Sequence, residues 1–195
     1  MKTIGLTGGI GSGKSIAARI LETMGVPLYR SDEEAKRLTN TSPVIRKALT
    51  ARFGDKLFAG ESLDKPLLAS LIFTDKENLQ FVNSVIHPVV FNDFLQWKQQ
   101  QELLSQPFIA IESAILFESG LDGAVDVIFL VSAPLETRIA RVEKRDQINR
   151  ASVLNRIRSQ QSEEERIARS DYVLINDGLQ ALLPQIENSL KKLSY

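Results

Sequence analysis

The stretch that decides the fold of this chain comprises residues 8–15, Gly8-Gly9-Ile10-Gly11-Ser12-Gly13-Lys14-Ser15. Its spacing is G-x-x-x-x-G-K-S, and it lies between an apolar run at residues 3–6 and a segment with helical spacing at residues 16–21. The glycines let the backbone turn so that successive N–H groups point inward, and the following helix presents its positive end to an anion. A strand, such a loop and a helix in this order are typical of a phosphate-binding loop (P-loop).

The last two residues of the loop carry the most specific chemistry. Lys14 is placed to reach the β- and γ-phosphates of a nucleotide, and Ser15 offers a hydroxyl where loops of this class ligate Mg²⁺. The structural alternative is a glycine-rich turn that contains a lysine by coincidence. The full pattern in its strand-to-helix context favours a nucleotide site.

Composition narrows the class of protein. The chain has 195 residues, 43% of them hydrophobic, which is enough for one domain with a buried core. Lys plus Arg and Asp plus Glu each number 24, so no global positive field draws the protein to nucleic acid or to an anionic membrane. There is no cysteine, no signal-peptide-like start and no apolar stretch that could cross a bilayer, from which we expect a cytoplasmic protein.

Short apolar runs predict five buried strands, at residues 3–7, 26–29, 108–111, 125–131 and 172–175. They are continuous rather than alternating, which is typical of strands covered on both faces of a parallel sheet. We therefore predict an α/β fold built on a five-stranded parallel sheet. The expected core comprises residues 1–30, 106–135 and 169–195.

Two long gaps between the strands predict added helical subdomains within this single domain. In the first gap, residues 31–105, helices are expected at residues 32–38, 43–53, 67–73, 77–86 and 89–104. Gly54, Gly60 and Pro88 separate them, so that Pro88 divides two helices. The second gap, residues 136–168, is rich in Arg, Glu and Gln and predicts a mobile pair of helices.

Two carboxylates follow predicted strands. In open parallel sheets the ligand lies beyond the C-terminal ends of the strands, where Asp32 follows the second strand and Glu112 ends the third. Either residue could position Mg²⁺ or accept the proton of an attacking hydroxyl. Asp32 is equally well placed to be the N-cap of the next helix, and spacing alone leaves both roles open.

Arg138, Arg141 and Arg145 recur at i, i+3 and i+7 and therefore share one side of a predicted helix. Such a row can clamp phosphate groups, and an arginine-bearing flap that closes over a phosphoryl-transfer site would exclude water and neutralise charge. The commoner alternative is a solvated face tied by Glu136 and Glu143. Spacing alone does not decide between them.

Beyond the P-loop, short patterns in order along nearly the whole chain resemble the dephospho-coenzyme A kinase family. They are residues 4–15, Ser31-Asp32 with Ala35, Leu63-Asp64-Lys65, His87-Pro88, Leu116-Phe117-Glu118, Arg138 with Arg141 and Arg145, Asp171-Tyr172-Val173 and Asn176-Asp177-Gly178. The later patterns are weak alone and specific in combination. Apart from the resemblance, His87 is the only histidine, which excludes histidine-rich metal sites and favours a structural role.

The resemblance implies a P-loop kinase core of the nucleoside-kinase-like group, with an acceptor-binding helical subdomain in the first gap and a helical lid in the second. It also implies the reaction, in which ATP with Mg²⁺ phosphorylates the ribose 3′-hydroxyl of dephospho-coenzyme A, the last step of coenzyme A synthesis. The expected partners are ATP and dephospho-coenzyme A, without nucleic acid or membrane. We expect a monomer.

The resemblance also implies roles for single residues. Asp32 resembles the carboxylate that orients and deprotonates the acceptor hydroxyl, with Lys14 and Arg141 as the other catalytic residues. The expected ATP-binding residues are Gly9, Gly11, Ser12, Gly13, Lys14, Ser15, Ile16, Arg138, Arg141 and Asn176. The expected acceptor-binding residues are Asp32, Leu63, Asp64, His87, Glu112 and Phe117. Ser15 is the expected protein ligand of Mg²⁺, together with the ATP phosphates.

The chain departs from the family pattern at several positions. Where the family commonly has Asp-x-Asp after the second strand, this chain has Arg30-Ser31-Asp32. Because residues i and i+2 of an extended segment point the same way, Arg30 could favour the ionised form of Asp32 or contact an acceptor phosphate. The other departures are Ile16 for Thr, Lys65 for Arg, Ala114 for Pro and Ser132 for an acid.

Other functions that share the P-loop fit less well. A regulatory GTPase would need an Asp-x-x-Gly switch and an Asn-Lys-x-Asp guanine motif, and the sequence has neither. A nucleic-acid-binding ATPase would use the arginine-rich segment as its contact surface, which the balanced net charge disfavours. A kinase of another small alcohol remains open, because the sequence does not measure the acceptor pocket.

Overall fold

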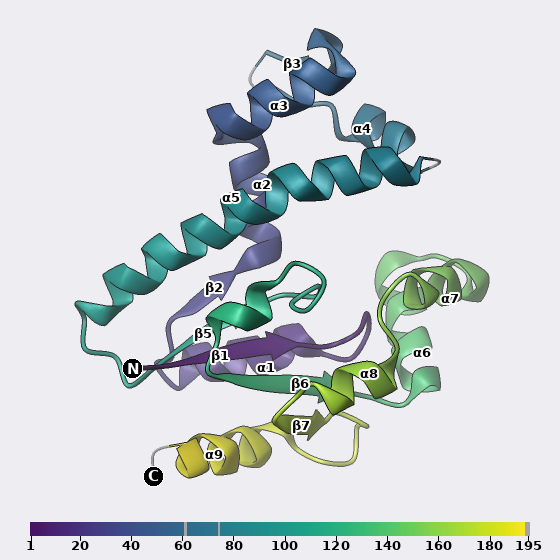
Figure 1. Cartoon of the computed structure of the whole chain (residues 1–195). Helices are drawn as coiled ribbons and strands as arrows, with labels where there is room; N and C mark the ends of the chain where they lie inside the picture. Colours follow the sequence, from purple (N-terminus) through teal and green to yellow (C-terminus); the bar gives the residue numbers. More distant parts are fainter. Residues whose placement is uncertain (61, 74, 194–195) are drawn as a thin grey trace. The chain divides into compact units, whose positions relative to one another are not determined.

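The computed structural model describes residues 1–60, 62–73 and 75–193 (Figure 1). The chain forms two compact units. One, the core unit, comprises Met1–Tyr29 and Gln101–Tyr195. The other, the inserted unit, comprises Arg30–Gln100.

The core unit is built on a five-stranded sheet with the order β2-β5-β1-β6-β7. Its strands are β1 (Lys2–Thr7), β2 (Leu28–Arg30), β5 (Phe108–Glu112), β6 (Val127–Ser132) and β7 (Tyr172–Ile175). The central strand β1 pairs in parallel with β5 and β6, and β6 pairs in parallel with β7. The predicted parallel α/β sheet is confirmed, with strand ends shifted by one or two residues from the expected bounds.

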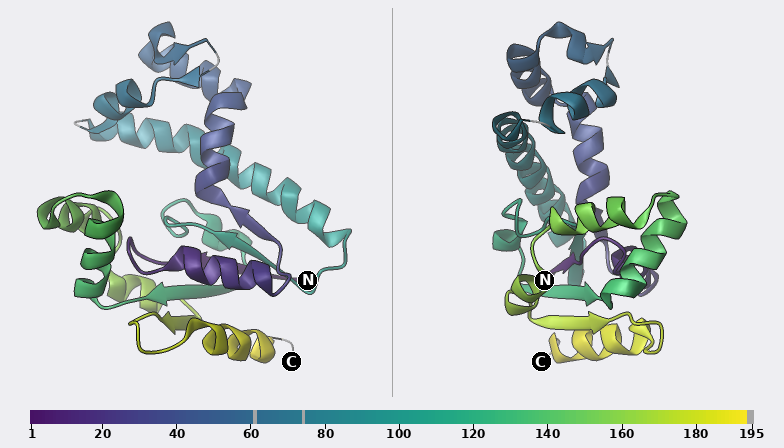
Figure 2. Two further views of the ribbon diagram at one scale, coloured as in Figure 1. Left: turned by 180° about the vertical axis from the view of Figure 1, so that it is seen from behind. Right: turned by 90° about the vertical axis from the view of Figure 1, so that its right-hand side faces the viewer.

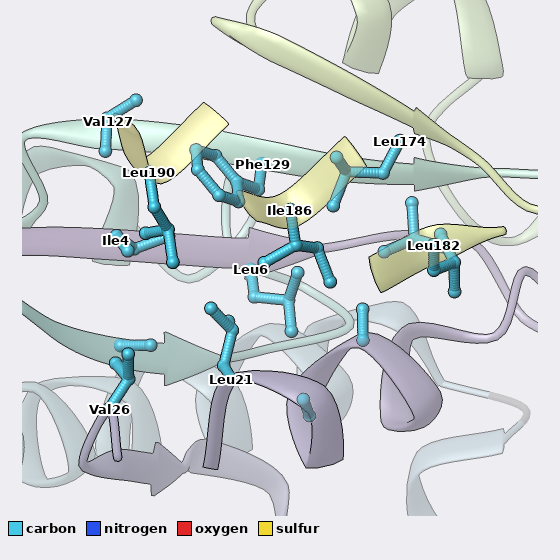
Figure 3. Close-up of a cluster of buried hydrophobic side chains, with 14 residues drawn as sticks. Ile4, Leu6, Leu21, Val26, Val127, Phe129, Leu174, Leu182, Ile186 and Leu190 are labelled. Atoms are coloured by element: carbon cyan, nitrogen blue, oxygen red, sulfur yellow. The ribbon is translucent and has the colours of Figure 1, made fainter. Parts of the chain in front are cut away.

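Helices α1 (Lys14–Thr23) and α9 (Leu182–Leu193) cover one face of this sheet. Figure 3 shows Leu182, Ile186 and Leu190 of α9 packed toward Ile4 and Leu6 of β1. The opposite face of β1 is also covered, because a Cβ at Gly5 would lie 2.9 Å from Leu116 and 3.1 Å from Val125. Burial on both faces explains why the strand sequence is continuously apolar. The P-loop therefore projects from a rigid strand.

Three helices lie between β6 and β7, where the sequence predicted a pair. They are α6 (Leu135–Asp146), α7 (Arg150–Arg158) and α8 (Glu163–Ala168). Asn149 caps α7, and a capping box formed by Ser162 and Glu165 starts α8. The prediction of two helices was wrong because these cap signals within the polar segment were not used.

The inserted unit is mainly helical. Its elements are α2 (Ser31–Thr41), α3 (Pro43–Phe53), η1 (Asp55–Leu57), the hairpin strands β3 (Phe58–Ala59) and β4 (Ser62–Leu63), α4 (Lys65–Phe73) and α5 (Lys76–Glu102). Nη2 of Arg37 donates to both carboxylate oxygens of Asp93, at 2.9 and 3.1 Å, and so joins α2 to α5. The β3–β4 hairpin was not predicted, since its paired strands are only two residues long.

Helix α5 runs unbroken through Pro88, which corrects the expectation of two helices (Figure 2). A proline inside a helix removes one backbone hydrogen bond and disfavours the local geometry. Val82, Val90 and Phe94, on both sides of Pro88, are buried. Their packing holds the two halves of the helix in line, so tertiary contacts override the local signal.

Candidate active site

The P-loop has a backbone that only glycine accommodates at two positions. Gly11 has φ +79° and Gly13 has φ +96°, both in the left-handed region. A Cβ at Gly11 would lie 2.5 Å from the carbonyl oxygen of Arg138, and one at Gly13 would overlap Nδ2 of Asn176. The glycines of the motif thus serve both the turn and the close approach of later parts of the chain.

The end of the loop is the N-terminus of α1. The amides of Ile16 and Ala17 donate to the carbonyl of Gly13, at 2.9 and 3.3 Å. The amides of Lys14 and Ser15 lie in the first turn and have no acceptor within the helix. Together with the helix dipole they form a site for an anion.

Lys14 is paired with the acid at the end of β5. Its Nζ lies 2.6 Å from Oε1 of Glu112, and the two side chains are only 12% and 10% exposed. Glu112 is in register with Leu6, the residue before the last of β1. The structure therefore brings Glu112, expected at the acceptor, to the P-loop lysine.

Two of the three arginines on α6 reach the P-loop. Arg138 is buried, and its Nε donates to the carbonyl of Ile10 at 3.0 Å. Nη1 of Arg141 lies 3.4 Å from the carbonyl of Gly11 and 3.3 Å from that of Ser12. Arg145 instead pairs with its neighbour Asp146 at 2.7 Å and is mostly exposed. Arg138 and Arg141 therefore contact the loop, whereas Arg145 lies on a solvated face.

Asn176, directly after β7, also supports the loop. Its buried Nδ2 donates to the carbonyl of Ser12 at 2.7 Å, and its Oδ1 accepts from Arg141 at 3.5 Å. Its own amide donates to Ser132 at 2.8 Å, which extends the pairing of β6 with β7 by one residue. The strand β7 therefore fixes the P-loop from the side of the sheet.

Comparison with known proteins identifies the family. The family model described as dephospho-CoA kinase matches residues 2–181. The chain belongs to the dephospho-CoA kinase family. A dephospho-CoA kinase of Bacteroides fragilis is 49% identical over 183 residues, which cover 94% of this chain and 88% of the relative. The resemblance seen in the sequence is confirmed, and with it a phosphate-transferring kinase family.

Solved structures share the fold of this chain. A crystal structure from Thermus thermophilus has a TM-score of 0.81 and 35% identity, covering 98% of this chain and 95% of that one. A dephospho-CoA kinase from Campylobacter jejuni has a TM-score of 0.72 at 21% identity, covering 98% and 96%, and shows the fold alone. No helix among the described residues of this dephospho-CoA kinase family member is long and apolar enough to span a membrane.

Two residues of the segment between β6 and β7 contact the loop without having been predicted from the sequence. Oε1 of Gln160 accepts a hydrogen bond from the amide of Ile10 at 2.9 Å. Arg166, on α8, is 1% exposed and lies beside Gly9, where a Cβ would be 2.6 Å from its Nη1. A buried arginine in a polar segment is unusual, but only the packing reveals it, because no spacing rule links these residues to the loop.

Most expected acceptor residues belong to the inserted unit. Asp32 is exposed in the first turn of α2, whose N-cap is Arg30 and has no side-chain cap bond. The interpretation of Asp32 as the N-cap was therefore wrong, although its charge suits that end of the helix dipole. Oδ1 of Asp64 accepts from the amide of Leu67 at 2.9 Å and so starts α4. His87 lies within α5.

Of the remaining expected residues, Phe117 and Ile16 lie in the core unit and Leu63 lies in the inserted unit. Phe117 is buried in the core unit, with the guanidinium of Arg169 4.1 Å from its ring centre. Ile16 is exposed on the first turn of α1. The amide of Leu63, in the inserted unit, donates to Asn40 at 3.0 Å. Phe117 is thus held by a cation–π contact as well as by burial.

Proposed function

We propose that the chain is a dephospho-CoA kinase that transfers the γ-phosphate of ATP to the ribose 3′-hydroxyl of dephospho-CoA. The observation that carries the proposal is a P-loop whose carbonyls are held by Arg138, Arg141 and Asn176, in a chain of this family. The acceptor oxygen forms a bond to the γ-phosphorus while the bond to the β–γ bridging oxygen breaks. ADP leaves with that electron pair, and the acceptor proton passes to Asp32.

The charges around the loop match what this transfer needs. Phosphoryl transfer depends on positioning and on neutralising the oxygens of the migrating group. Lys14 would exchange Glu112 for the β- and γ-phosphates, and the first amides of α1 would bind phosphate oxygens. Arg141 would meet the migrating group from the side of α6.

For the acceptor, we propose as binding residues the set that the resemblance implies, namely Asp32, Leu63, Asp64, His87, Glu112 and Phe117. Asp32 is exposed in the first turn of α2 and is not its N-cap, which suits a proton acceptor. Asp64 already caps α4, so its contribution would be to fix the start of that helix beside the acceptor.

Mg²⁺ would arrive with ATP rather than reside in the protein. In the described part of the chain, no group of three or more His, Cys, Asp or Glu side chains could hold a metal ion. The hydroxyl of Ser15 is exposed in the first turn of α1. Mg²⁺ typically keeps several waters and binds through one or two protein oxygens plus phosphates, so a single hydroxyl fits. The ion supplies positive charge to the phosphates.

The substrate assignment is tested by offering the purified chain Mg-ATP with a panel of acceptors. The panel contains dephospho-CoA, adenosine, nucleoside monophosphates and pantetheine, and product mass is followed. We expect phosphorylation of dephospho-CoA in preference to the others. Preference for another acceptor would overturn the assignment.

The role of Asp32 is tested against its neighbour Glu33, which is also exposed in the first turn of α2. Asp32→Asn should lower turnover by roughly two to four orders of magnitude, the range for general acid–base groups, with ATP binding kept. Glu33→Gln should leave turnover nearly unchanged while removing a similar charge from the helix end. Equal turnover in the two variants would limit Asp32 to helix stabilisation.

A further inference from the structure

Three charged side chains gather in the core unit beside the P-loop. Arg138 comes from α6, and Glu163 and Arg166 come from α8. Oε2 of Glu163 lies 3.2 Å from Nη1 of Arg138 and 3.6 Å from Nη1 of Arg166. The arginines are only 5% and 1% exposed. Two buried positive charges thus share one carboxylate.

The guanidiniums of Arg138 and Arg166 lie beside Gly9, at the end of the loop that follows β1. A Cβ at Gly9 would overlap Nη2 of Arg138 and would lie 2.6 Å from Nη1 of Arg166. Arg138 has its Nε occupied by the carbonyl of Ile10. Arg166, by contrast, has a buried Nη2 without a hydrogen-bond partner among the described residues.

A purely structural ion triad does not account for this arrangement. Buried charges are tolerated when they are paired and when their donors are satisfied. Here the positive charge exceeds the negative, and Oε1 of Glu163 is also without a partner in the described chain. Burial lowers the pKa of Arg138, and Arg166 lowers it further against the opposing effect of Glu163. An anion at Gly9 would relieve this excess.

We propose that the guanidinium of Arg166 binds the γ-phosphate of the nucleotide beside Gly9, and that Glu163 is a positioning residue that holds Arg138 and Arg166 there. The proposal rests on the proposed ATP-dependent function. In P-loops the backbone amides cradle the α- and β-phosphates, while Gly9 lies at the other end of the loop, beside β1. Arg166 therefore faces the terminal phosphate rather than the inner ones.

The test measures binding to the full chain by calorimetry, with a nonhydrolysable ATP analogue and with ADP. Arg166→Met should weaken binding of the analogue by roughly 10- to 100-fold, the range for a charge-assisted hydrogen bond, and binding of ADP by less than about threefold. Arg158→Met, an exposed arginine on α7, is the control and should change neither. Circular dichroism checks that each variant is folded.

A second variant covers the case in which Arg166→Met does not fold. Gly9→Ala places a methyl group against both guanidiniums without changing α8, and Gly9 has no positive φ to cause strain. It should show the same preferential loss of the ATP analogue. Unchanged preference for the analogue over ADP, or equal losses for both ligands, would overturn the role of Arg166. If the unmodified chain binds neither ligand, the proposed function itself fails.

Discussion

Two glycines with positive φ lie at opposite ends of α1, and we expect alanine to destabilise the protein more at one than at the other. Gly13 starts the helix with φ +96°, and a Cβ there would overlap Nδ2 of Asn176, which donates to the carbonyl of Ser12 at 2.7 Å. Gly25 follows the helix with φ +83°, and a Cβ there would meet nothing within 4 Å. Alanine at Gly13 would therefore have a strained backbone and a steric clash with Asn176. Alanine at Gly25 would have a strained backbone but no clash.

The expected magnitudes follow from these differences. A left-handed conformation costs an L-residue about 1–2 kcal/mol, of which about 0.4–1 kcal/mol is offset by the smaller entropy of the unfolded chain. Gly25→Ala should therefore lower the free energy of unfolding by about 1 kcal/mol. Gly13→Ala also displaces Asn176 and leaves buried polar groups unpaired, which costs about 1–3 kcal/mol more.

Urea unfolding followed by circular dichroism measures both variants. Trp97 lies in α5, so its fluorescence reports separately on the inserted unit and shows whether the units unfold together. We also expect Gly13→Ala to lose at least about tenfold in ADP affinity, because the amides of α1 shift with the loop. Equal destabilisation of the two variants, with ADP affinity kept in Gly13→Ala, would contradict the steric argument.

The other predictions concern α6. Arg141→Met should slow phosphoryl transfer by roughly 10²- to 10³-fold in single-turnover kinetics, because the substitution removes a guanidinium from the loop. Arg145→Met is the control and should retain full activity, because Arg145 pairs with Asp146 and does not contact the loop. Full activity in both variants would refute a role for Arg141. The hydrogen bond from Arg145 and the charge of Arg156 hold the pKa of Asp146 below 3.8. The stability from this pairing is thus present above pH 3.8 and is lost as the pH falls through the lower pKa of the folded state. In Arg145→Met the carboxyl carbon shift of Asp146, followed by NMR, should titrate closer to 3.8, and an unchanged midpoint would contradict the assignment of the cause.

The sheet and the loop were predictable because their signals are local. A strand buried on both faces must be continuously apolar, as β1 is, and a backbone with φ +79° and +96° requires glycine at Gly11 and Gly13. The continuity of α5 through Pro88 was not predictable in the same way. Its sequence favours a helix end, and only the packing of Val82 and Phe94 keeps the helix continuous.

The candidate site was predictable where residues follow strands or share a helix face. Glu112 is the last residue of β5, and Arg138 and Arg141 share a helix side, whereas Asn176, directly after β7, was implied by the family resemblance. Gln160 and Arg166 give no such signal, since their contact with the loop depends on how three short helices pack. The spacing of Arg145 fits the row equally well, yet the residue turns to Asp146.

The residues that hydrogen-bond to the P-loop lie far from it in the sequence, which affects how the loop is formed during translation of the chain. The loop is translated among the first residues, whereas Glu112, Arg138, Gln160 and Asn176, which hold it, follow about 100 to 165 residues later. A nascent chain on the ribosome therefore carries the motif long before anything fixes its shape. Under the proposed function, we expect nucleotide binding only after translation has passed β7, so that ATP would stabilise the finished protein but not its unfinished precursors.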